Sequence, residues 1–255
     1  MTAGAGAGRA PRQRHIPKMA QVVATELRER ILGGEFAEGE SLSTESALVE
    51  EYGISRPTLR EALRLLEAQQ LIVVRRGSHR GSVVSRPDPG PTAESFSLLL
   101  QLRRATLADV YEFRSVFEPP AVRMAAERAT GRDVERLREL LEREWEVRTD
   151  PDEFPRVAWR FHTELIRISG NVTMTVTAEM LEMISAQHAR RAQVSWWDGD
   201  SQRRRAYRAH CRVVELIAGR DGPEAERYWS EHMAEVGKKL GQTAESSIIE
   251  IMDRS

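Results

Sequence analysis

The 255-residue sequence predicts a mainly α-helical protein in two parts: three short helices with a β-hairpin, and then an antiparallel bundle of about seven helices. Three observations support this prediction. Apolar residues recur at helical spacing along most of the chain, whereas residues 71–84 are rich in β-branched side chains. Residues 86–91 read Arg-Pro-Asp-Pro-Gly-Pro, which favours neither a helix nor a strand and separates the two parts.

The composition is typical of an ordered, helix-rich protein, with 40% hydrophobic and 30% charged residues. The formal net charge of −1 does not by itself indicate nucleic-acid binding. No apolar run approaches the roughly 20 residues that cross a bilayer, and no secretory signal precedes the first helix. We therefore expect a cytoplasmic protein with no membrane partner. Cys211 is the one cysteine, so an internal disulfide is excluded and a reducing compartment fits.

The amino-terminal part starts with a flexible basic tail at residues 1–17. A first helix is expected over residues 18–32, where two glycines follow it. The buried face of this helix is expected to carry Val22, Val23, Leu27 and Ile31. A shorter helix follows, directs Ala47 and Leu48 inward and stops at Gly53.

The third helix has the clearest start. Ser55 is a good N-cap residue, and Pro57 is tolerated because it falls in the first turn. Leu59, Leu63 and Leu66 then form the buried stripe.

A hairpin is expected next, with strands at residues 71–74 and 82–84 around a basic loop that glycines flank. We expect the first domain to span residues 18–85. Residues 86–93 are the expected linker.

The second domain is expected at residues 94–241, with a tail at 242–255. Its helical segments are predicted near residues 94–104, 107–128, 133–147, 152–169, 173–192, 201–219 and 223–240. Pro119 and Pro120 interrupt the second segment, so we expect a kink or a break there.

The outward face of the third helix carries Arg56, Thr58, Arg60 and Arg64. A helix fits the major groove and arginine offers a bidentate fork to guanine, so this face satisfies the geometry for reading DNA. The hairpin loop would act as a wing, where Arg76 and His79 supply charge and Gly77 allows close approach. The alternative is that the arginines form an ordinary solvated face.

The order of these elements matches a known signature. The matching residues are Leu27-Arg28, Ile31, Gly34, Gly39-Glu40, Leu42, Glu45, Gly53-Ile54-Ser55-Arg56, Leu59-Arg60-Glu61-Ala62-Leu63, Leu66, Leu71 and Gly77. Over about residues 18–85 the chain resembles the GntR-family winged helix-turn-helix. The resemblance implies that Arg56 and Arg60 read bases and phosphates of operator DNA. It also implies that Ser55, Pro57 and Thr58 lie near the DNA backbone, with Arg76-Gly77 at the wing.

Two positions depart from that family. Ser43 stands where the family commonly has proline, and Ser46 stands where it commonly has arginine. The missing arginine removes one expected DNA contact, so operator sequence or affinity is expected to differ.

The helical part carries a second set of matching residues: Asp109-Val110-Tyr111-Glu112-Phe113-Arg114, Glu118-Pro119, Ala125-Ala126, Phe161-His162, Leu165, Ser169-Gly170-Asn171, His210 and His232. Over about residues 95–240 the chain resembles the FCD effector domain of the FadR subfamily. Our hypothesis is that two protomers pair as a homodimer, bind a palindromic operator and block transcription until an effector occupies the bundle. An activator would use the same parts, and the sequence does not distinguish the two.

His162, His210 and His232 fall on three different predicted helices. Three neutral imidazoles that meet in a bundle core can hold a divalent metal, zinc or nickel-like, and leave a position open for water or an effector carboxylate. The resembled family has an aspartate one turn before the first histidine, where this chain has Ala158. The sequence therefore leaves two alternatives open: a metal-binding trio, or hydrogen-bonded core histidines beside a metal-free pocket for a fatty acid or acyl-CoA.

Arg114 stands where the resembled family places an arginine close to the effector cavity. The effector-binding set implied by the resemblance is thus Arg114, His162, His210 and His232, and the ligand class is an organic acid or acyl group. An ordinary ion pair of Arg114 with Glu118, four residues on, is the alternative. Trp159 can line a pocket or belong to the core.

Two other classes of function remain as alternatives. A metal-dependent hydrolase on the bundle would use the three histidines, but no HExxH pair accompanies them. An adaptor without DNA binding would use the basic hairpin to hold acidic partners. We favour a regulator without enzymatic activity.

Overall fold

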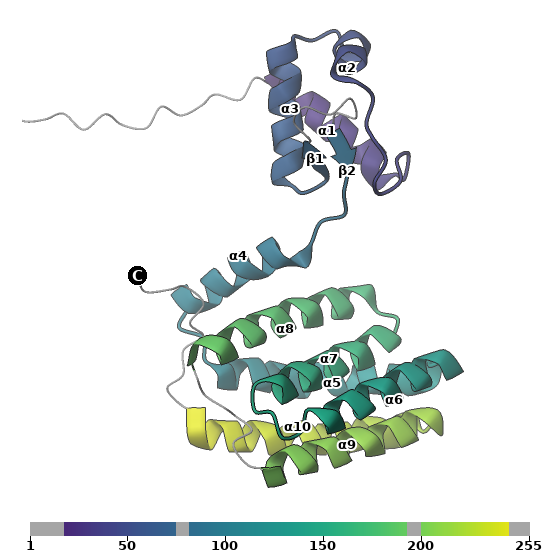
Figure 1. Cartoon of the computed structure of the whole chain (residues 1–255), viewed down its shortest axis with the longest axis vertical. Helices are drawn as coiled ribbons and strands as arrows, with labels where there is room; N and C mark the ends of the chain where they lie inside the picture. Colours follow the sequence, from purple (N-terminus) through teal and green to yellow (C-terminus); the bar gives the residue numbers. More distant parts are fainter. Residues whose placement is uncertain (1–17, 75–81, 193–199, 245–255) are drawn as a thin grey trace, which may run out of the picture. The chain divides into compact units, whose positions relative to one another are not determined.

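The computed structural model describes residues 18–74, 82–192 and 200–244 of the chain. The chain divides after Asp88 into two compact units. Both are mainly helical, as the sequence predicts (Figure 1). Each has its own hydrophobic core.

The first unit contains three helices and a hairpin: α1 (Lys18–Leu32), α2 (Glu45–Tyr52), α3 (Arg56–Ala68), β1 (Ile72–Val74) and β2 (Ser82–Val84). The strands pair antiparallel, with Ile72 opposite Val84. The backbone at Ser41 adds a single bridge to Val83, which the sequence did not predict because one bridge leaves no periodic pattern.

The turn between α2 and α3 is defined at both ends. Gly53 ends α2 with a φ of 60°, in the left-handed region that favours glycine. Ser55 then caps α3, because its hydroxyl accepts a hydrogen bond from the backbone N–H of Thr58 at 3.3 Å. Pro57 lies in the first turn of α3, where its missing N–H costs no helical hydrogen bond.

The core of the first unit lies between α1, α2, α3 and the hairpin. Its buried residues are Ala20, Val23, Ala24, Leu27, Ile31, Leu42, Leu48, Leu59, Ala62, Leu63, Leu66, Leu71, Ile72 and Val84. The inward placement predicted for Val22 and Ala47 is wrong, because both side chains are exposed. The buried faces of their helices follow Val23 and Leu48, and the preceding residue of a helix points to a different side.

The second unit consists of α4 (Pro89–Leu102), α5 (Leu107–Arg128), α6 (Gly131–Glu146), α7 (Glu153–Ile168), α8 (Val172–Ala192), α9 (Asp200–Ala218) and α10 (Gly222–Ala244). Helix α5 packs against α7, α9 and α10, while α6 packs against α7 and α9. Among the helices in the described ranges, none combines the length and low polarity needed to span a membrane.

Two expectations about prolines need correction. Helix α4 begins at Pro89, inside the segment predicted as a linker, because prolines are accommodated in a first helical turn. Helix α5 continues through Pro119 and Pro120 without a break. The buried residues on both sides of these prolines, Glu118 and Val122 among them, keep the helix packed against its neighbours.

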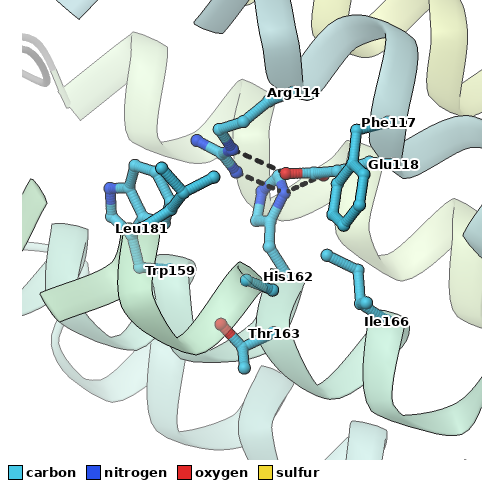
Figure 2. A pocket seen from close by; sticks show the side chains of 9 residues that line it. Arg114, Phe117, Glu118, Trp159, His162, Thr163, Ile166 and Leu181 are labelled. Carbon is cyan, nitrogen blue, oxygen red and sulfur yellow. Dashed lines mark hydrogen bonds and ion pairs between the residues drawn. The ribbon is translucent and has the colours of Figure 1, made fainter. Parts of the chain in front are cut away.

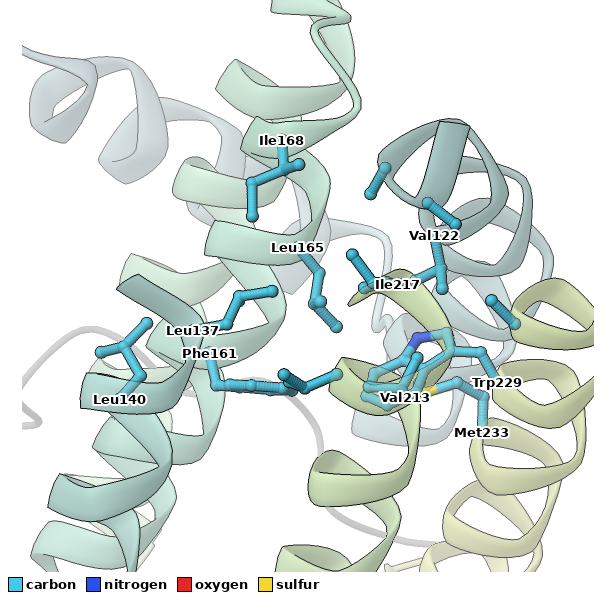
Figure 3. Close-up of a cluster of buried hydrophobic side chains, with 14 of the residues drawn as sticks. Val122, Leu137, Leu140, Phe161, Leu165, Ile168, Val213, Ile217, Trp229 and Met233 are labelled. Atoms are coloured by element: carbon cyan, nitrogen blue, oxygen red, sulfur yellow. The ribbon is translucent and has the colours of Figure 1, made fainter. Parts of the chain in front are cut away.

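The core of the second unit forms where α5, α6, α7, α9 and α10 meet (Figure 3). Phe161 and Leu165 of α7 lie between the leucines of α6 and the side chains of α9. Trp229 and Met233 of α10 are completely buried in the same cluster. Buried charged residues also occur in this unit, and they define the site described below.

Leu59 offers a direct test of the first core. Its side chain is completely buried at the start of α3, so Leu59→Ala should lower the free energy of unfolding of this unit by roughly 2–5 kcal/mol. Leu32→Ala is the matched control, because Leu32 is 70% exposed. Native-state hydrogen exchange of the α1 and α3 amides measures both effects. Equal protection in the two variants would contradict the packing described here.

Candidate functional site

The outward face of α3 carries the arginines that the sequence predicts as DNA contacts. Arg56, Arg60 and Arg64 are all exposed, and the side chains of Arg60 and Arg64 are 62% and 67% accessible. They recur every four residues because the buried leucine stripe takes the opposite face of the helix. Ser55 and Pro57 are exposed at the start of the same helix, and Thr58 is partly exposed.

The contacts that these arginines make are weak ones. Arg60 lies 3.5 Å from the carboxylate of Glu45, and Arg64 lies 3.1 Å from Glu61. Exposed ion pairs of this kind contribute about 0–1 kcal/mol, so a phosphate or base can replace the carboxylate. Arg56 donates a hydrogen bond to the hydroxyl of Ser46 at 3.2 Å. Ser46, which departs from the family pattern, thus contacts an expected DNA reader.

The wing residues Arg76, Gly77 and His79 lie outside the described residues. Their part in DNA binding stays a prediction.

The three predicted histidines come together in the second unit. His162 comes from α7, His210 from α9 and His232 from α10, and all three are buried. One ligand atom from each lies within 4.8 Å of the other two. The histidine trio is the one group of this kind in the described part of the chain.

Aromatic side chains surround the trio. Phe161 stacks on His210 with ring centroids 4.5 Å apart. The Trp229 ring lies 4.8 Å from those of both His162 and His232. These rings exclude water from the imidazoles and hold their orientation.

Two carboxylates contact the trio, each at the Nδ1 atom of one histidine. Glu118 Oε2 lies 2.6 Å from Nδ1 of His162, and Glu144 Oε2 lies 2.8 Å from Nδ1 of His210. Capping boxes at Thr106 and Thr130 fix the starts of α5 and α6, which carry these carboxylates. Local sequence thus sets the register of both helices.

Arg114 and Glu118 form a buried ion pair one helical turn apart (Figure 2). Arg114 Nε donates to Glu118 Oε1 at 2.6 Å, and Trp229 Nε1 donates to Oε2 at 2.9 Å. The Arg114 guanidinium also lies 3.7 Å from the centre of the Trp159 ring, a cation–π contact. The ion pair weighed from the sequence is therefore present, and Arg114 also lines a pocket.

Burial and these partners shift the pKa values of the site. Burial tends to raise the pKa of Glu118, but Arg114, His162 and the hydrogen bond from Trp229 together outweigh it, and the pKa lies well below its usual range. Burial lowers the pKa of His162 to about 4, against the opposing attraction of Glu118. Burial also lowers the pKa of His232 well below its ordinary value. Both imidazoles are therefore neutral near pH 7, the form that ligates metals.

The histidine trio fits a divalent metal ion. Nε2 of His210 and Nε2 of His232 are buried and have no hydrogen-bond partner in the described structure. Buried polar atoms without a partner are unusual, and imidazole nitrogen is a preferred zinc ligand. Nδ1 of His162 lies 2.6 Å from Glu118 Oε2, which accepts, and 2.7 Å from Arg114 Nη2, which donates. In the tautomer that donates to Glu118, Nε2 of His162 also keeps a lone pair. Ala158 packs with Val147, Phe154 and Ala206 in a small apolar cluster and contributes no ligand.

A small pocket with about 10 Å³ of free space, room for about one water molecule, lies next to the trio. Its lining is Arg114, Phe117, Glu118, Trp159, His162, Thr163, Ile166, Ala178 and Leu181 (Figure 2). The lining is mainly apolar, with charge confined to Arg114 and Glu118. Of the residues predicted to bind an effector, Arg114 and His162 reach this pocket.

Glu144 was not among the site residues predicted from the sequence. This residue continues the apolar stripe of Leu137, Leu140 and Leu141 on α6, and all four side chains are buried. A carboxylate at a stripe position is the signal that could have identified it.

Comparison with known proteins places the chain in a family. Residues 19–83 match the bacterial regulatory proteins of the gntR family, and residues 109–235 match the FCD domain. The chain belongs to the GntR family of bacterial regulators, with an FCD domain of the FadR-like subfamily.

Its relatives include the HTH-type transcriptional repressor NanR of Cronobacter sakazakii, 31% identical over 237 residues that cover 91% of this chain and 88% of that protein. NanR of Enterobacter sp. is 29% identical over 235 residues, covering 90% and 88%. A solved structure of Streptococcus agalactiae GntR superposes with a TM-score of 0.63 at 24% identity, covering 86% of this chain and 99% of that one, and supports the fold alone. The chain is a GntR-type transcription regulator and not an enzyme, so the hydrolase and adaptor alternatives are set aside.

The ion pairs on α5 provide a matched stability test. Arg114–Glu118 is buried and Arg123–Glu127 is exposed, with the same four-residue spacing. Glu118→Gln leaves the Arg114 charge unpaired in the core, so it should lower the free energy of unfolding by about 3–5 kcal/mol. Glu127→Gln should leave it nearly unchanged.

Urea unfolding of the metal-free chain, followed by tryptophan fluorescence, measures both variants because every tryptophan lies beyond residue 140. A small, equal effect of the two substitutions would contradict the role given to the buried pair.

Proposed function

We propose that this chain is a repressor that binds operator DNA through the outward face of α3, with Arg56 and Arg60 as the main readers. The observation that supports it is the exposure of Arg56, Arg60 and Arg64 on a helix whose start Ser55 and Gly53 define. Ser55, Pro57 and Thr58 stand at the end of α3 that enters the groove, close to the DNA backbone. Arg76, Gly77 and His79 act as the wing.

Two copies of the chain bind a palindromic operator, each reading one half-site. A pair of α3 helices fits half-sites whose centres lie about one helical turn, 10–10.5 base pairs, or a multiple of it, apart. A protein of this kind works in the cytoplasm, where its DNA is found.

The histidine trio holds one divalent metal ion, zinc or nickel-like, through His162, His210 and His232. Such an ion supplies a positive centre with an open position for an anionic ligand. The unpartnered Nε2 atoms of His210 and His232 support this assignment.

The pocket beside the trio receives a small organic acid or acyl-type effector. The pocket has to widen to admit such a ligand, because its free space is about that of one water molecule. Its apolar lining then suits a carbon chain, while Arg114 and His162 offer polar contacts at one side. Because Glu118 already pairs with Arg114, an effector carboxylate has to compete with that pair. Effector binding lowers operator affinity through a coupling free energy, typically about 1–3 kcal/mol.

DNA binding is tested with the double variant Arg56→Ala plus Arg60→Ala. We expect affinity for the intergenic DNA upstream of the chain's own gene to fall at least about tenfold, because each base-reading arginine contributes about 1–3 kcal/mol. Fluorescence anisotropy at fixed physiological salt measures the affinity.

The matched control is Arg136→Ala plus Arg138→Ala, which removes the same charge from the exposed face of α6. Equal loss of affinity in both double variants would refute the assignment of α3 as the reading helix.

Metal binding is tested by titrating Zn²⁺ into tag-free, chelator-treated protein in a calorimeter. We expect one ion per chain. His162→Ala should weaken binding by more than roughly 100-fold, because losing a metal ligand costs more affinity than losing a residue that only hydrogen-bonds to a ligand. Cys211→Ser controls for the one thiol and should bind as the wild type does. If neither Zn²⁺ nor Ni²⁺ binds the wild type, the metal assignment is wrong and the pocket is metal-free.

A further inference from the structure

Glu144 is a buried carboxylate beside the histidine trio that the proposed function does not yet use. Its side chain is completely excluded from solvent. Oε2 accepts a hydrogen bond from Nδ1 of His210, whereas Oε1 has no partner. In the described part of the chain, His210 is the one ion-pair partner of Glu144.

An ionised carboxylate in such a place is costly unless positive charge stands close to it. Glu118 has that charge, because Arg114 lies 2.6 Å away. No arginine or lysine of the described residues forms an ion pair with Glu144. A divalent cation on the far side of the His210 ring would supply the missing positive charge.

The hydrogen bond also decides which nitrogen of His210 is available. When Glu144 is ionised it can only accept, so Nδ1 of His210 then carries the proton and Nε2 keeps the lone pair. Nε2 is also the nitrogen that lacks a partner. A carboxylate behind a ligating histidine fixes the ring and makes its other nitrogen a better donor.

Position 158 explains why this carboxylate matters in this chain. The helix turn before His162 carries Ala158, so the site lacks an anionic group there. Ala158 packs instead with Val147, just after Glu144 in sequence, and with Ala206, one turn before His210. The segments that carry Glu144 and His210 therefore meet at Ala158.

We propose that Glu144 supplies, through His210, the negative charge that Ala158 does not provide. Glu144 is a positioning residue: it keeps the proton of His210 on Nδ1 and leaves Nε2 to ligate a divalent cation. This inference rests on the metal-binding role proposed above for the trio.

The test compares Glu144→Gln with Glu142→Gln in the full chain. Both changes remove one negative charge from α6, but Glu142 is exposed. Glu144→Leu is a second variant, which fills the space without an acceptor, and tryptophan fluorescence checks that each bundle is folded. Two quantities are measured: Zn²⁺ affinity by calorimetry, and the ¹⁵N shifts of the His210 ring in metal-free protein, assigned with a His210→Gln variant.

We expect the wild type and Glu142→Gln to bind Zn²⁺ equally and to protonate His210 on Nδ1. In Glu144→Gln and Glu144→Leu the affinity should fall about 10- to 100-fold, and Nε2 should take up part or all of the proton. If the Zn²⁺ affinity and the His210 tautomer are unchanged in both Glu144 variants, the role given to Glu144 is wrong, whereas the metal site itself still holds. An equal loss in Glu142→Gln would overturn this role too, since charge and not position would then matter. A wild type that binds no Zn²⁺ would overturn the metal site and this inference together.

Discussion

The second unit depends on placing charged and polar groups inside an apolar bundle without leaving them unpaired. Arg114 and Glu118 neutralise each other, and Glu118 also accepts from Trp229 and contacts His162. Removing one member would leave its partners buried without a counter-charge or hydrogen bond, which lowers the free energy of unfolding. The network therefore requires α5, α7 and α10 to keep one arrangement. The pocket beside it is shaped by the same residues.

The first unit meets a different constraint, because it must expose charge instead of burying it. Its core is built from aliphatic side chains of short helices and the hairpin, and the leucines of α3 fix which face of that helix is solvent-exposed. Gly53 and Ser55 fix where the helix begins. A reading helix needs both features, since a rotation about its axis or a shifted start would move the arginines away from the groove.

Much of this arrangement could be predicted from the sequence. Caps, glycines and apolar spacing located α1, α3 and the hairpin strands almost to the residue, because these signals act over a few residues of chain. Errors arose where packing overrides local preference: Val22 and Ala47 are exposed, and α5 runs through Pro119 and Pro120. Glu144 was not predicted because its role depends on His210, which lies 66 positions away in the sequence.

By itself, the sequence determined the family, the mainly helical two-part organisation and the identity of the three histidines. Motif spacing and helical periodicity could be recognised because they involve residues that lie close together in the chain. Only the tertiary structure decided that the histidines meet within 4.8 Å, that Arg114 is paired with Glu118, and that Glu144 lies behind His210. Distances between helices depend on how their side chains pack, and that packing cannot be read along a single chain.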